Sequence, residues 1–518
     1  MRVASLLLLT FFSSSVLAED SWWQFLGPDG NGHTRATELP LNWTEHDDVA
    51  WKTPIHDRGW SSPVIHGNQI WLTTATTDGY RLFAICIDTN TGRVLHDRQI
   101  FDVEDPQKIS SENTYATPTP VIESGRVFLH FGTYGTACLD TKTGDTLWTR
   151  RDLKCDHETN AGPASSPTII GDNVVVHVDG RDVQYIIALD KVTGETVWKT
   201  LRSYDYSKVP VHMRKGYGMP GIAPRGDAIQ LVSSTGQGVY AYDVSGNELW
   251  RVRHKGWSIA PRPVAGHGLV FAIVDRDHPE LWAIRHDGSG DVTESHIVWK
   301  ETRSMPARCT PLLVDDLLYV VNRAGIMTCL EAKTGEVVWK QRLDGEYSAT
   351  PVFAKDRIYL FNEDAVCTVI RPGRKFEVIA VNSLAKQQLL ASPAVDGNAF
   401  IVRTANYLYR IETGARRPAD PQATAMSFIG RWDIGRPKDG GKPNFVMALN
   451  ADFTARKSHV PGATGKWQLV NGEARVTWSD GWRDILRREG NHYRKLAFRP
   501  GTDFDSAPNN TESADKLP

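Results

Sequence analysis

Asp140-Thr141-Lys142-Thr143-Gly144-Asp145-Thr146-Leu147-Trp148 decides the fold, because the same phrase returns along the chain. An acidic residue, Thr-Gly and a Trp four residues after that Gly recur from Asp190 to Trp198 and from Glu331 to Trp339, and a shortened copy runs from Asp243 to Trp250. Repeats of roughly 40 to 50 residues that each carry several short strands are typical of propeller blades. The repeat therefore predicts an all-β propeller.

Two independent counts of the repeat agree on eight copies. Each copy starts with a proline and an apolar run, at Pro63, Pro120, Pro167, Pro220, Pro263, Pro311, Pro351 and Pro393. Each also has a turn that ends in glycine, at Gly92, Gly144, Gly194, Gly246, Gly290, Gly335, Gly373 and Gly414. Neighbouring prolines are between 40 residues (Pro311 to Pro351) and 57 residues (Pro63 to Pro120) apart. Two more apolar runs lie between each proline and its turn, so every copy has room for four strands.

The eighth copy lacks its last strand. It breaks off after Gly414, whereas the segment from Asp48 to Thr53 near the N-terminus matches the one from Glu195 to Thr200. A ring in which the first strand completes the last blade leaves no exposed sheet edge for aggregation. We therefore expect an eight-bladed propeller closed by an N-terminal strand, with Trp51 paired to the blade that begins near Pro393.

The acidic residue, Thr-Gly and Trp at this spacing resemble the tryptophan-docking repeat of pyrroloquinoline-quinone-type eight-bladed propellers. The resemblance covers about residues 45 to 415. It implies that an indole of one blade docks on the neighbouring blade, a structural role that falls to Trp51, Trp148, Trp198, Trp250 and Trp339. Three copies depart from the pattern, with His96 at the Trp position, Trp299 after a longer interval, and Phe376 in the seventh copy. Those blades are expected to dock less regularly.

The segments on either side of the repeat predict an exported chain. Arg2, the apolar run from Leu6 to Phe12 and the small-residue site Val16-Leu17-Ala18 are typical of a secretory signal peptide over residues 1–18. No Cys follows the apolar run to carry a lipid anchor, and no later apolar stretch is long enough for a transmembrane segment. The expected location is periplasmic or secreted. Residues 19–44 form an aromatic arm, whose segment from Ser21 to Pro28 is expected on the outside of the ring.

The rest of the chain follows the propeller, which is assigned to residues 45–415. Residues 416–427 are interpreted as a linker and residues 428–502 as a small antiparallel β domain, because short alternating runs are split there by Gly and Asp turns. Its tryptophans, which include Trp432, Trp467, Trp478 and Trp482, favour a packed core, with a sugar-binding platform as the alternative. The polar tail, residues 503–518, is expected to be disordered.

Charge and cysteine content exclude some classes and leave others open. Lys plus Arg number 59 and Asp plus Glu 61, for a net charge of −2, so electrostatics give no argument for nucleic acid as a partner. Six Cys are too few for a disulfide framework and favour small buried side chains. A single bridge between Cys138 and Cys155, or between Cys309 and Cys329, stays open.

No catalytic or metal-ligating constellation stands out in the sequence. Quinoprotein dehydrogenases of the family that the repeat resembles hold pyrroloquinoline quinone under two adjacent, linked Cys, next to a calcium ion, and this chain has no adjacent Cys pair. The cluster from Cys155 to Glu158 begins like a zinc protease motif, but Ala161 stands where the second His is required. The sequence therefore predicts neither a cofactor nor a metal, except under an oxidoreductase alternative.

A binding surface follows from topology. If the proline starts the innermost strand of each blade, the residues just before it line one mouth of the central channel, where propeller loops meet ligands or partners. These candidates are Arg58, Trp60, Asn113, Tyr115, Asp156, His157, Glu158, Arg308, Glu346 and Tyr347. Alternatively, they only solvate the rim. Replacing Trp60 and Tyr115 by Ala is expected to abolish binding and to leave thermal stability little changed.

Two function classes follow from these observations. The first is an exported, non-enzymatic propeller that binds other exported or envelope proteins, or a ligand, and is similar to the propeller subunit of the outer-membrane protein assembly machinery. The second is a periplasmic quinone-dependent oxidoreductase that acts on an alcohol or sugar. The missing Cys pair favours the first class.

Overall fold

The computed structural model describes residues 21–45, 47–157, 161–415, 425–436, 442–470, 472–489, 492–504, 506 and 508–517. The predicted signal peptide lies outside these residues, as do candidate site residue Glu158 and residues 416–424 of the predicted linker. Contacts divide the chain into two compact units, Met1–Ala415 and Arg416–Pro518. In the described part of the chain no helix has the length and apolarity needed to cross a membrane.

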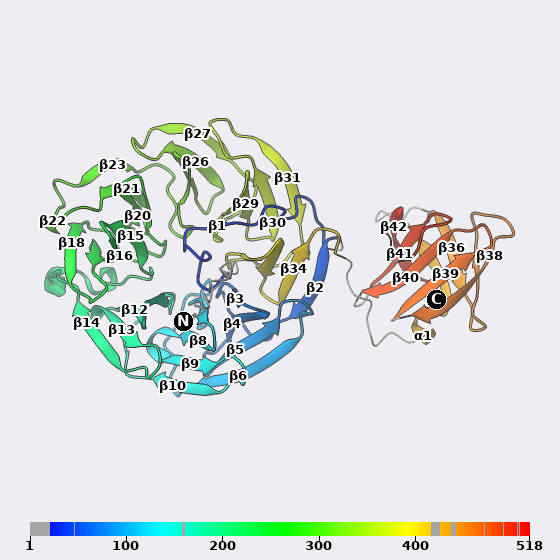
Figure 1. Ribbon diagram of the computed structural model, residues 1–518, viewed down its shortest axis with the longest axis horizontal. Coiled ribbons are helices and arrows are strands. Elements are labelled where there is room, and N and C mark those ends of the chain that lie inside the picture. The colour runs from blue at the N-terminus through cyan, green and yellow to red at the C-terminus, as the bar shows by residue number, and fades with distance from the viewer. Residues whose placement is uncertain are drawn as a thin grey trace, which may run out of the picture. The chain divides into compact units, whose positions relative to one another are not determined.

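The first unit is the predicted eight-bladed propeller (Figure 1). Each blade is an antiparallel sheet whose strands run outward in sequence order from the central channel. The first four blades comprise β3 (Val64–His66), β4 (Gln69–Ala75), β5 (Arg81–Asp88) and β6 (Val94–Asp102); β7 (Val121–Glu123), β8 (Arg126–His130), β9 (Thr136–Asp140) and β10 (Thr146–Arg150); β11 (Thr168–Ile170), β12 (Asn173–Asp179), β13 (Gln184–Asp190) and β14 (Thr196–Leu201); β15 (Gly221–Arg225), β16 (Ala228–Thr235), β17 (Gly238–Tyr242) and β18 (Glu248–Arg253).

The other four blades repeat this order. They comprise β19 (Val264–Gly266), β20 (Leu269–Val274), β21 (Glu280–Arg285) and β23 (Ile297–Glu301); β24 (Leu312–Val314), β25 (Leu317–Val321), β26 (Ile326–Glu331) and β27 (Val337–Arg342); β28 (Val352–Ala354), β29 (Arg357–Phe361), β30 (Val366–Ile370) and β31 (Val378–Ser383); β32 (Ala394–Asp396), β33 (Ala399–Arg403), β34 (Tyr407–Glu412) and β2 (Val49–Pro54). Short 3-10 turns lie at Gly132–Tyr134, Tyr206–Lys208 and Val211–Met213.

The N-terminal strand closes the ring as predicted. Strand β2 pairs antiparallel with β34 and places Trp51 opposite Arg410. The middle strands of each blade are almost wholly buried, as in β8, whereas most outermost strands are largely exposed or half-buried, as in β10. The hydrophobic core therefore lies between adjacent blades, and each blade depends on its neighbours for burial of its apolar faces.

The acidic residue of the repeat shapes the turn before the outer strand. The carboxylate of Asp140 accepts the backbone N–H groups of Lys142 and Thr143, each at 2.8 Å, and Asp190 holds its own turn in the same way. Gly144 follows at a φ of +73°, a conformation in which a Cβ is strained. Acceptance of backbone N–H bonds lowers the pKa of Asp140.

The Trp of one blade lies on this turn of the next blade. The indole Nε1 of Trp148 donates to the Lys191 carbonyl at 3.2 Å, and a Cβ added to Gly194 would come within 2.6 Å of the ring. The same Nε1 bond to the following blade is made by Trp51 to Thr89 O, Trp198 to Val244 O, Trp299 to Ala332 O and Trp339 to Gly373 O. Trp299 thus makes this bond despite its longer interval.

Trp250 departs from this geometry. Its indole is fully buried, and its Nε1 donates within its own blade to the side chain of Gln230 at 2.8 Å. The short strand β22 (Gly290–Asp291) lies parallel to β18 and pairs Gly290 with Trp250. The turn of the fifth repeat copy therefore adds an extra strand to the fourth blade, and no indole docks on it. No atom lies within 4 Å of a Cβ added at Gly290.

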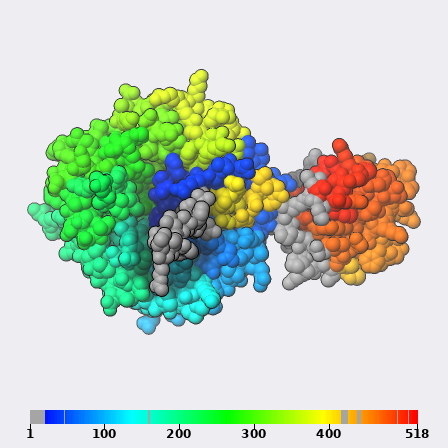
Figure 2. Space-filling view, in the orientation of Figure 1, coloured from blue at the N-terminus to red at the C-terminus, as the bar shows by residue number. Residues whose placement is uncertain are grey.

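The arm lies in the channel and not on the outside of the ring, so the expected position of Ser21 to Pro28 is wrong. The carbonyls of Trp22 and Trp23 accept N–H groups from the innermost strands of the first two blades, at Ile65 (2.8 Å) and Ile122 (2.9 Å). Strand β1 (His33–Thr34) then pairs parallel with β28. The innermost strand of each blade leaves one edge unpaired toward the channel, and the arm satisfies several of these edges. Figures 1 and 2 show this dark blue segment across the centre of the ring.

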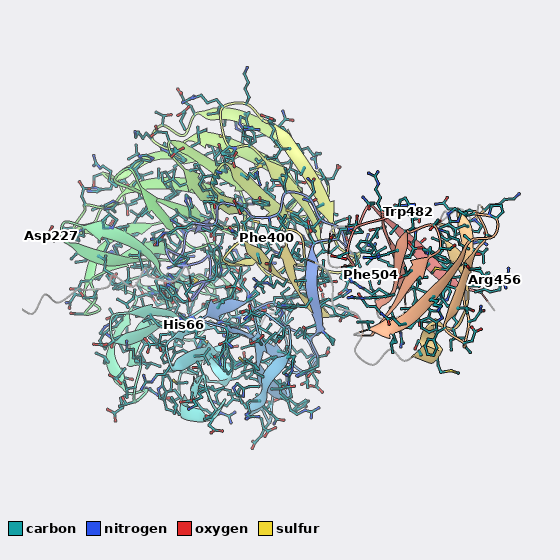
Figure 3. The ribbon with its side chains drawn as sticks, turned by 45° about the vertical axis from the view of Figure 1, so that its right-hand side comes forward. His66, Asp227, Phe400, Arg456, Trp482 and Phe504 are labelled. Atoms are coloured by element: carbon teal, nitrogen blue, oxygen red, sulfur yellow. The ribbon has the colours of Figure 1, made fainter. Side chains whose placement is uncertain are left out.

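Beyond β1 the arm runs outward to reach β2. The ring of Trp43 packs between the seventh and eighth blades, with its centroid 5.9 Å from that of Phe400, which is labelled in Figure 3. Phe400 in turn contacts Tyr359 edge to face at 4.8 Å. The N–H of Trp43 donates to the Asn382 side chain at 2.9 Å. The described part of the arm therefore contributes buried side chains to the propeller core, among them Trp22, Leu39 and Trp43.

The second unit is a small antiparallel β domain, as predicted, and its sheet is a closed barrel of eight strands. A short helix, α1 (Ala425–Phe428), precedes the barrel. The strands are β35 (Gly430–Ile434), β36 (Phe445–Leu449), β37 (Thr454–Lys457), β38 (Thr464–Val470), β39 (Glu473–Trp478), β40 (Arg483–Glu489), β41 (His492–Phe498) and β42 (Asn510–Lys516). The tail expected to be disordered instead supplies β42, because its backbone pairs with both β41 and β35 and closes the barrel.

The barrel core is aromatic. Trp432, Trp467 and Trp478 are buried and Trp482 is partly buried against them, so these rings form the core of the domain and not a sugar-binding platform. The indole Nε1 of Trp478 donates to the buried carboxylate of Asp484 at 2.7 Å.

We predict that Gly335→Ala destabilises the protein more than Gly290→Ala. Both glycines end the repeat turn at similar φ values (+77° and +70°), so the backbone strain is matched, but a Cβ at Gly335 would come within 2.6 Å of the docked Trp299. Displacing that indole is expected to add about 1 to 3 kcal/mol to the cost. Urea denaturation of the two variants measures the difference, and equal losses would show that the docked indole tolerates the methyl group.

Candidate functional site

The residues before the repeat prolines join the blades at one end of the channel. The backbone N–H of the residue before the proline donates to a hydroxyl at the same position of the next blade in five places among the described residues. Ser62 donates to Thr119 and Thr119 to Ser166, both at 2.9 Å, and the same bonds join Arg262 to Thr310, Thr310 to Thr350 and Thr350 to Ser392 at 2.9 to 3.1 Å. Proline holds the preceding residue extended and donates no N–H itself, so these bonds repeat with the same geometry.

We call this end of the channel the mouth, and the side chains Ser62, Thr119, Ser166, Thr310, Thr350 and Ser392 the hydroxyl ring. Two blades lack the hydroxyl, because Met219 and Arg262 occupy its position. Arg262 is buried and its Nη1 donates to the carbonyl of Phe25 in the arm at 3.2 Å and to the side chain of Gln24 at 3.3 Å. Arg262 therefore ties the hydroxyl ring to the arm.

A cavity of about 270 Å³ opens at the mouth. Phe25 of the arm forms part of its lining, so the arm closes the channel beneath it. The walls combine aromatic and apolar side chains with hydroxyls and two arginines: Trp60, Tyr217, Met219, Ala260, Ala307 and Leu390; Ser62, Thr119, Ser166, Thr350 and Ser392; Arg276 and Arg308. The cavity is thus blind, with a hydroxyl-lined base and cationic groups on its wall.

A loop from the first blade reaches over this cavity. Residues 103–119 connect β6 to β7, and we call this loop the strap. Its Ser110, Glu112 and Asn113 line the cavity. The amide of Asn113 donates to Ala161 O at 2.6 Å and to Pro163 O at 3.2 Å, and Gln107 accepts the backbone N–H of His157 at 2.8 Å. The strap is therefore fixed at two points, near its start and next to its tip, to the connection between the second and third blades.

An ion-pair latch joins the tip of the strap to the opposite side of the ring. The two carboxylate oxygens of Glu112 accept separately, one from Arg308 and the other from Arg323 at 2.8 Å. Arg323 also lies 3.0 Å from Glu346, and both arginines lie within 3.7 Å of Glu363. Glu112 and Arg323 are each 42% exposed, so the latch is accessible to solvent.

Charge and burial act in opposite directions on Glu112. Partial burial alone raises the pKa of its carboxyl, but the hydrogen bond from Arg323 and the charge of Arg308 outweigh it, so the pKa lies below its ordinary value of 4.5. The strap is therefore held by a charged carboxylate at neutral pH.

The structure brings together some of the predicted site residues. Trp60, Asn113 and Arg308 line the cavity, and Arg58 donates to the carbonyl of Ser111 in the strap at 3.4 Å. Glu346 lies at the edge, paired with Arg323. These five residues belong to one mouth, as the position of the prolines predicts.

Other predicted residues do not reach the cavity. Tyr115 is buried in the core between the first two blades and donates to Gln107 O at 2.8 Å, while Tyr347 is fully buried in another core cluster. Asp156 pairs with Arg181 at 3.4 Å. Trp60 and Tyr115 are only 7% and 6% exposed, so replacing both by Ala removes core packing. The expectation that the double variant would keep its stability is therefore not supported by their positions.

His157 lies under the mouth beside a thiol. Its Nε2 is 3.2 Å from the Sγ of Cys155, and both residues are buried. Burial lowers the pKa of His157 to about 4 and raises that of Cys155, so the pair is neutral. All six cysteines are free thiols, so neither of the two bridges that the sequence left open is formed. Across the described ranges, no group of three or more His, Cys, Asp or Glu is placed to hold a metal ion.

Sequence reasoning missed Glu112, Arg276, Tyr217 and Phe25. The first of these carried a signal, because the interval of 57 residues from Pro63 to Pro120 indicates an insertion before the second blade. The partners of Glu112 lie 196 and 211 residues further along the chain, so no local pattern could identify them. Phe25 was missed because the arm was expected elsewhere.

A calcium-bound quinone does not fit this lining. The ion requires free oxygen ligands, mainly carboxylates. Among the described residues that line the cavity, Glu112 is the only carboxylate, and both its oxygens already accept from arginines. The sequence also has no adjacent Cys pair to cover a flat ring.

Comparison with known proteins shows one family. The model of the family described as outer membrane protein assembly factor BamB matches residues 34–200, 182–307 and 291–417. No curated protein sequence matches this chain significantly.

Several solved structures share the fold. A europium-containing methanol dehydrogenase is 11% identical, covers 75% of this chain and 90% of its own, and superposes with a TM-score of 0.56. Quinohemoprotein alcohol dehydrogenase from Comamonas testosteroni is 9% identical, covers 78% of this chain and 82% of its own, and superposes with a TM-score of 0.54. BamB from Moraxella catarrhalis is 15% identical, covers 70% of this chain and 99% of its own, and has a TM-score of 0.47. At these identities the structural matches show the propeller fold alone.

We predict that acid opens the latch. Because the pKa of Glu112 is lowered in the folded protein, its contribution is fully present above the ordinary pKa of 4.5 and is lost as pH falls through the lowered value. Spin labels at Ser111 and Ala324 would report the separation across the latch. We expect one distance from neutral pH down to the ordinary Glu pKa, and a longer, broader distribution once the pH has fallen below the lowered pKa of Glu112. Glu112→Gln should show the broad distribution at every pH, and a narrow one in that variant would contradict the latch.

Proposed function

This chain belongs to the family of outer membrane protein assembly factor BamB, and on that premise we propose that it is an exported, non-enzymatic propeller that binds a protein partner or a ligand. The proposed binding site is the mouth of the central channel. The partners are other exported or envelope proteins, in keeping with the family's description as an outer membrane protein assembly factor. The proposed location is periplasmic or secreted.

The observation that carries this proposal is the blind cavity at the mouth. Phe25 and the rest of the arm close the channel below it, while the strap and Arg308 border its opening. A channel that is closed on one side presents one concave, rigidly supported surface, which suits recognition. Connections that lead into all eight blades contribute lining residues, so a partner seated there would contact the whole ring.

The alternative is a periplasmic oxidoreductase that uses pyrroloquinoline quinone and calcium on an alcohol or sugar. Its support is the fold likeness to the quinone-type dehydrogenases named above. The described part of the lining argues against it, because Glu112, the one carboxylate among those residues, is already paired with two arginines. We therefore assign no catalytic residue and derive no redox step.

We predict that partners crosslink at the mouth and not at the opposite face. A photoreactive amino acid at Ser111, which is exposed on the strap, is expected to yield discrete adducts in intact cells. The control position is Asp227, which is also exposed but lies in the turn at the far end of strand β15. Mass spectrometry identifies the adducts. Equal or greater crosslinking at Asp227 would contradict a binding site at the mouth.

A further inference from the structure

We propose that the mouth cavity binds a carboxylate attached to a compact apolar or aromatic body, and that Glu112 of the strap occupies the place of this carboxylate when no ligand is bound. The inference rests on the proposed function, because it assigns a ligand class to the same site.

The first observation is the position of Glu112. A carboxylate from a loop of the first blade lies at the edge of the cavity between Arg308 and Arg323, which belong to strand connections of the sixth blade. Each oxygen accepts from a different guanidinium. This geometry shows that the two arginines can hold one carboxylate between them.

The second observation is the set of hydroxyls deeper in the cavity. Thr119, Ser166, Thr350 and Ser392 each accept a backbone N–H, and each is less than 9% exposed. A hydroxyl that accepts still has one O–H to donate. Within the ranges that the structure describes, none of these four donates to a protein acceptor, so the base of the cavity offers donors to a ligand rich in acceptors.

The third observation is the composition of the wall. Phe25, Trp60 and Tyr217 supply aromatic surface, and the charged side chains among the described lining residues are Arg276, Arg308 and Glu112. With Glu112 displaced, the remaining charge of these described residues is positive. A cavity of about 270 Å³ accommodates a body the size of one aromatic amino acid.

These observations make the strap an internal competitor. A ligand carboxylate that takes the place of Glu112 preserves the charge balance around Arg308 and Arg323, and the freed strap then allows entry from the mouth. The ligand's source is either a small free acid or the C-terminal residue of a peptide, since both present the same carboxylate beside an apolar side chain.

Calorimetric titration tests the proposal with two matched pairs of probes. N-acetylphenylalanine and its amide represent the small acid and its neutral counterpart. A hexapeptide that ends in phenylalanine, with a free or amidated terminus, represents the chain end. We expect only the carboxylates to bind, and Glu112→Gln to tighten their binding about tenfold, because the side chain keeps its shape but no longer competes as a charged group.

Two further variants control for indirect effects. Glu346→Gln removes a carboxylate that also pairs with Arg323 but does not line the cavity, so it is expected to change affinity much less than Glu112→Gln. Arg308→Gln is expected to weaken binding about tenfold or more. Binding of the acid alone or of both carboxylates would identify a small-molecule site, and binding of the peptide alone would identify a chain terminus.

The proposal is overturned if acids and amides bind alike, if neither acid binds to Glu112→Gln, or if Arg308→Gln binds as tightly as the wild type. Such a failure is distinct from failure of the proposed function, because photocrosslinking at Ser111 reports a partner at the mouth whatever chemistry holds it.

Discussion

The contact between each blade and the next sets the geometry of everything else in the propeller. Blades are joined at two radii: near the channel by a backbone N–H that donates to the next hydroxyl, as from Ser62 to Thr119, and at the periphery by an indole that donates to the next turn, as from Trp148 to Lys191. A single blade cannot bury its apolar faces, so its fold depends on both neighbours. Because the inner bonds immediately precede the innermost strands, they also fix the loops that form the mouth.

The parts of the fold that repeat could be predicted from the sequence. The match between Asp48–Thr53 and Glu195–Thr200 located the closing strand, because the same side chains pack in the same positions in each blade. Parts that occur once could not. The polar segment of β42 buries only Ala514 among its seven residues, so it lacks the alternation that indicates a strand, and the ladder to β41 and β35 determines it instead. The repeat also predicted the wrong contact for Trp250. Strand β22 of the fifth copy pairs with β18, and the indole of Trp250 bonds to Gln230 within its own blade instead of to the next turn.

The sequence placed several candidate residues at one mouth of the channel, where they lie in the structure, but it did not identify the long-range contacts that shape the cavity there. Local spacing placed Trp60, Asn113 and Arg308 before or near the innermost strands, and all three line the cavity. Its base depends on an arm whose course across the channel is set by unpaired strand edges, and its opening depends on an ion pair between residues about 200 positions apart. Such contacts follow from the closed ring and not from any local pattern. Together, the contacts of the arm and of the strap make the mouth a cavity that is closed on one side and has a polar base. For this reason we favour the binding of a partner or ligand over redox chemistry.

The most direct test of that choice is a calorimetric titration of the mature protein with pyrroloquinoline quinone, once with calcium and once with a chelator. The account predicts no binding that depends on calcium, because the described residues of the lining include no free carboxylate for the ion. Saturable one-to-one binding that requires calcium would contradict it and would make this propeller a quinone-dependent oxidoreductase.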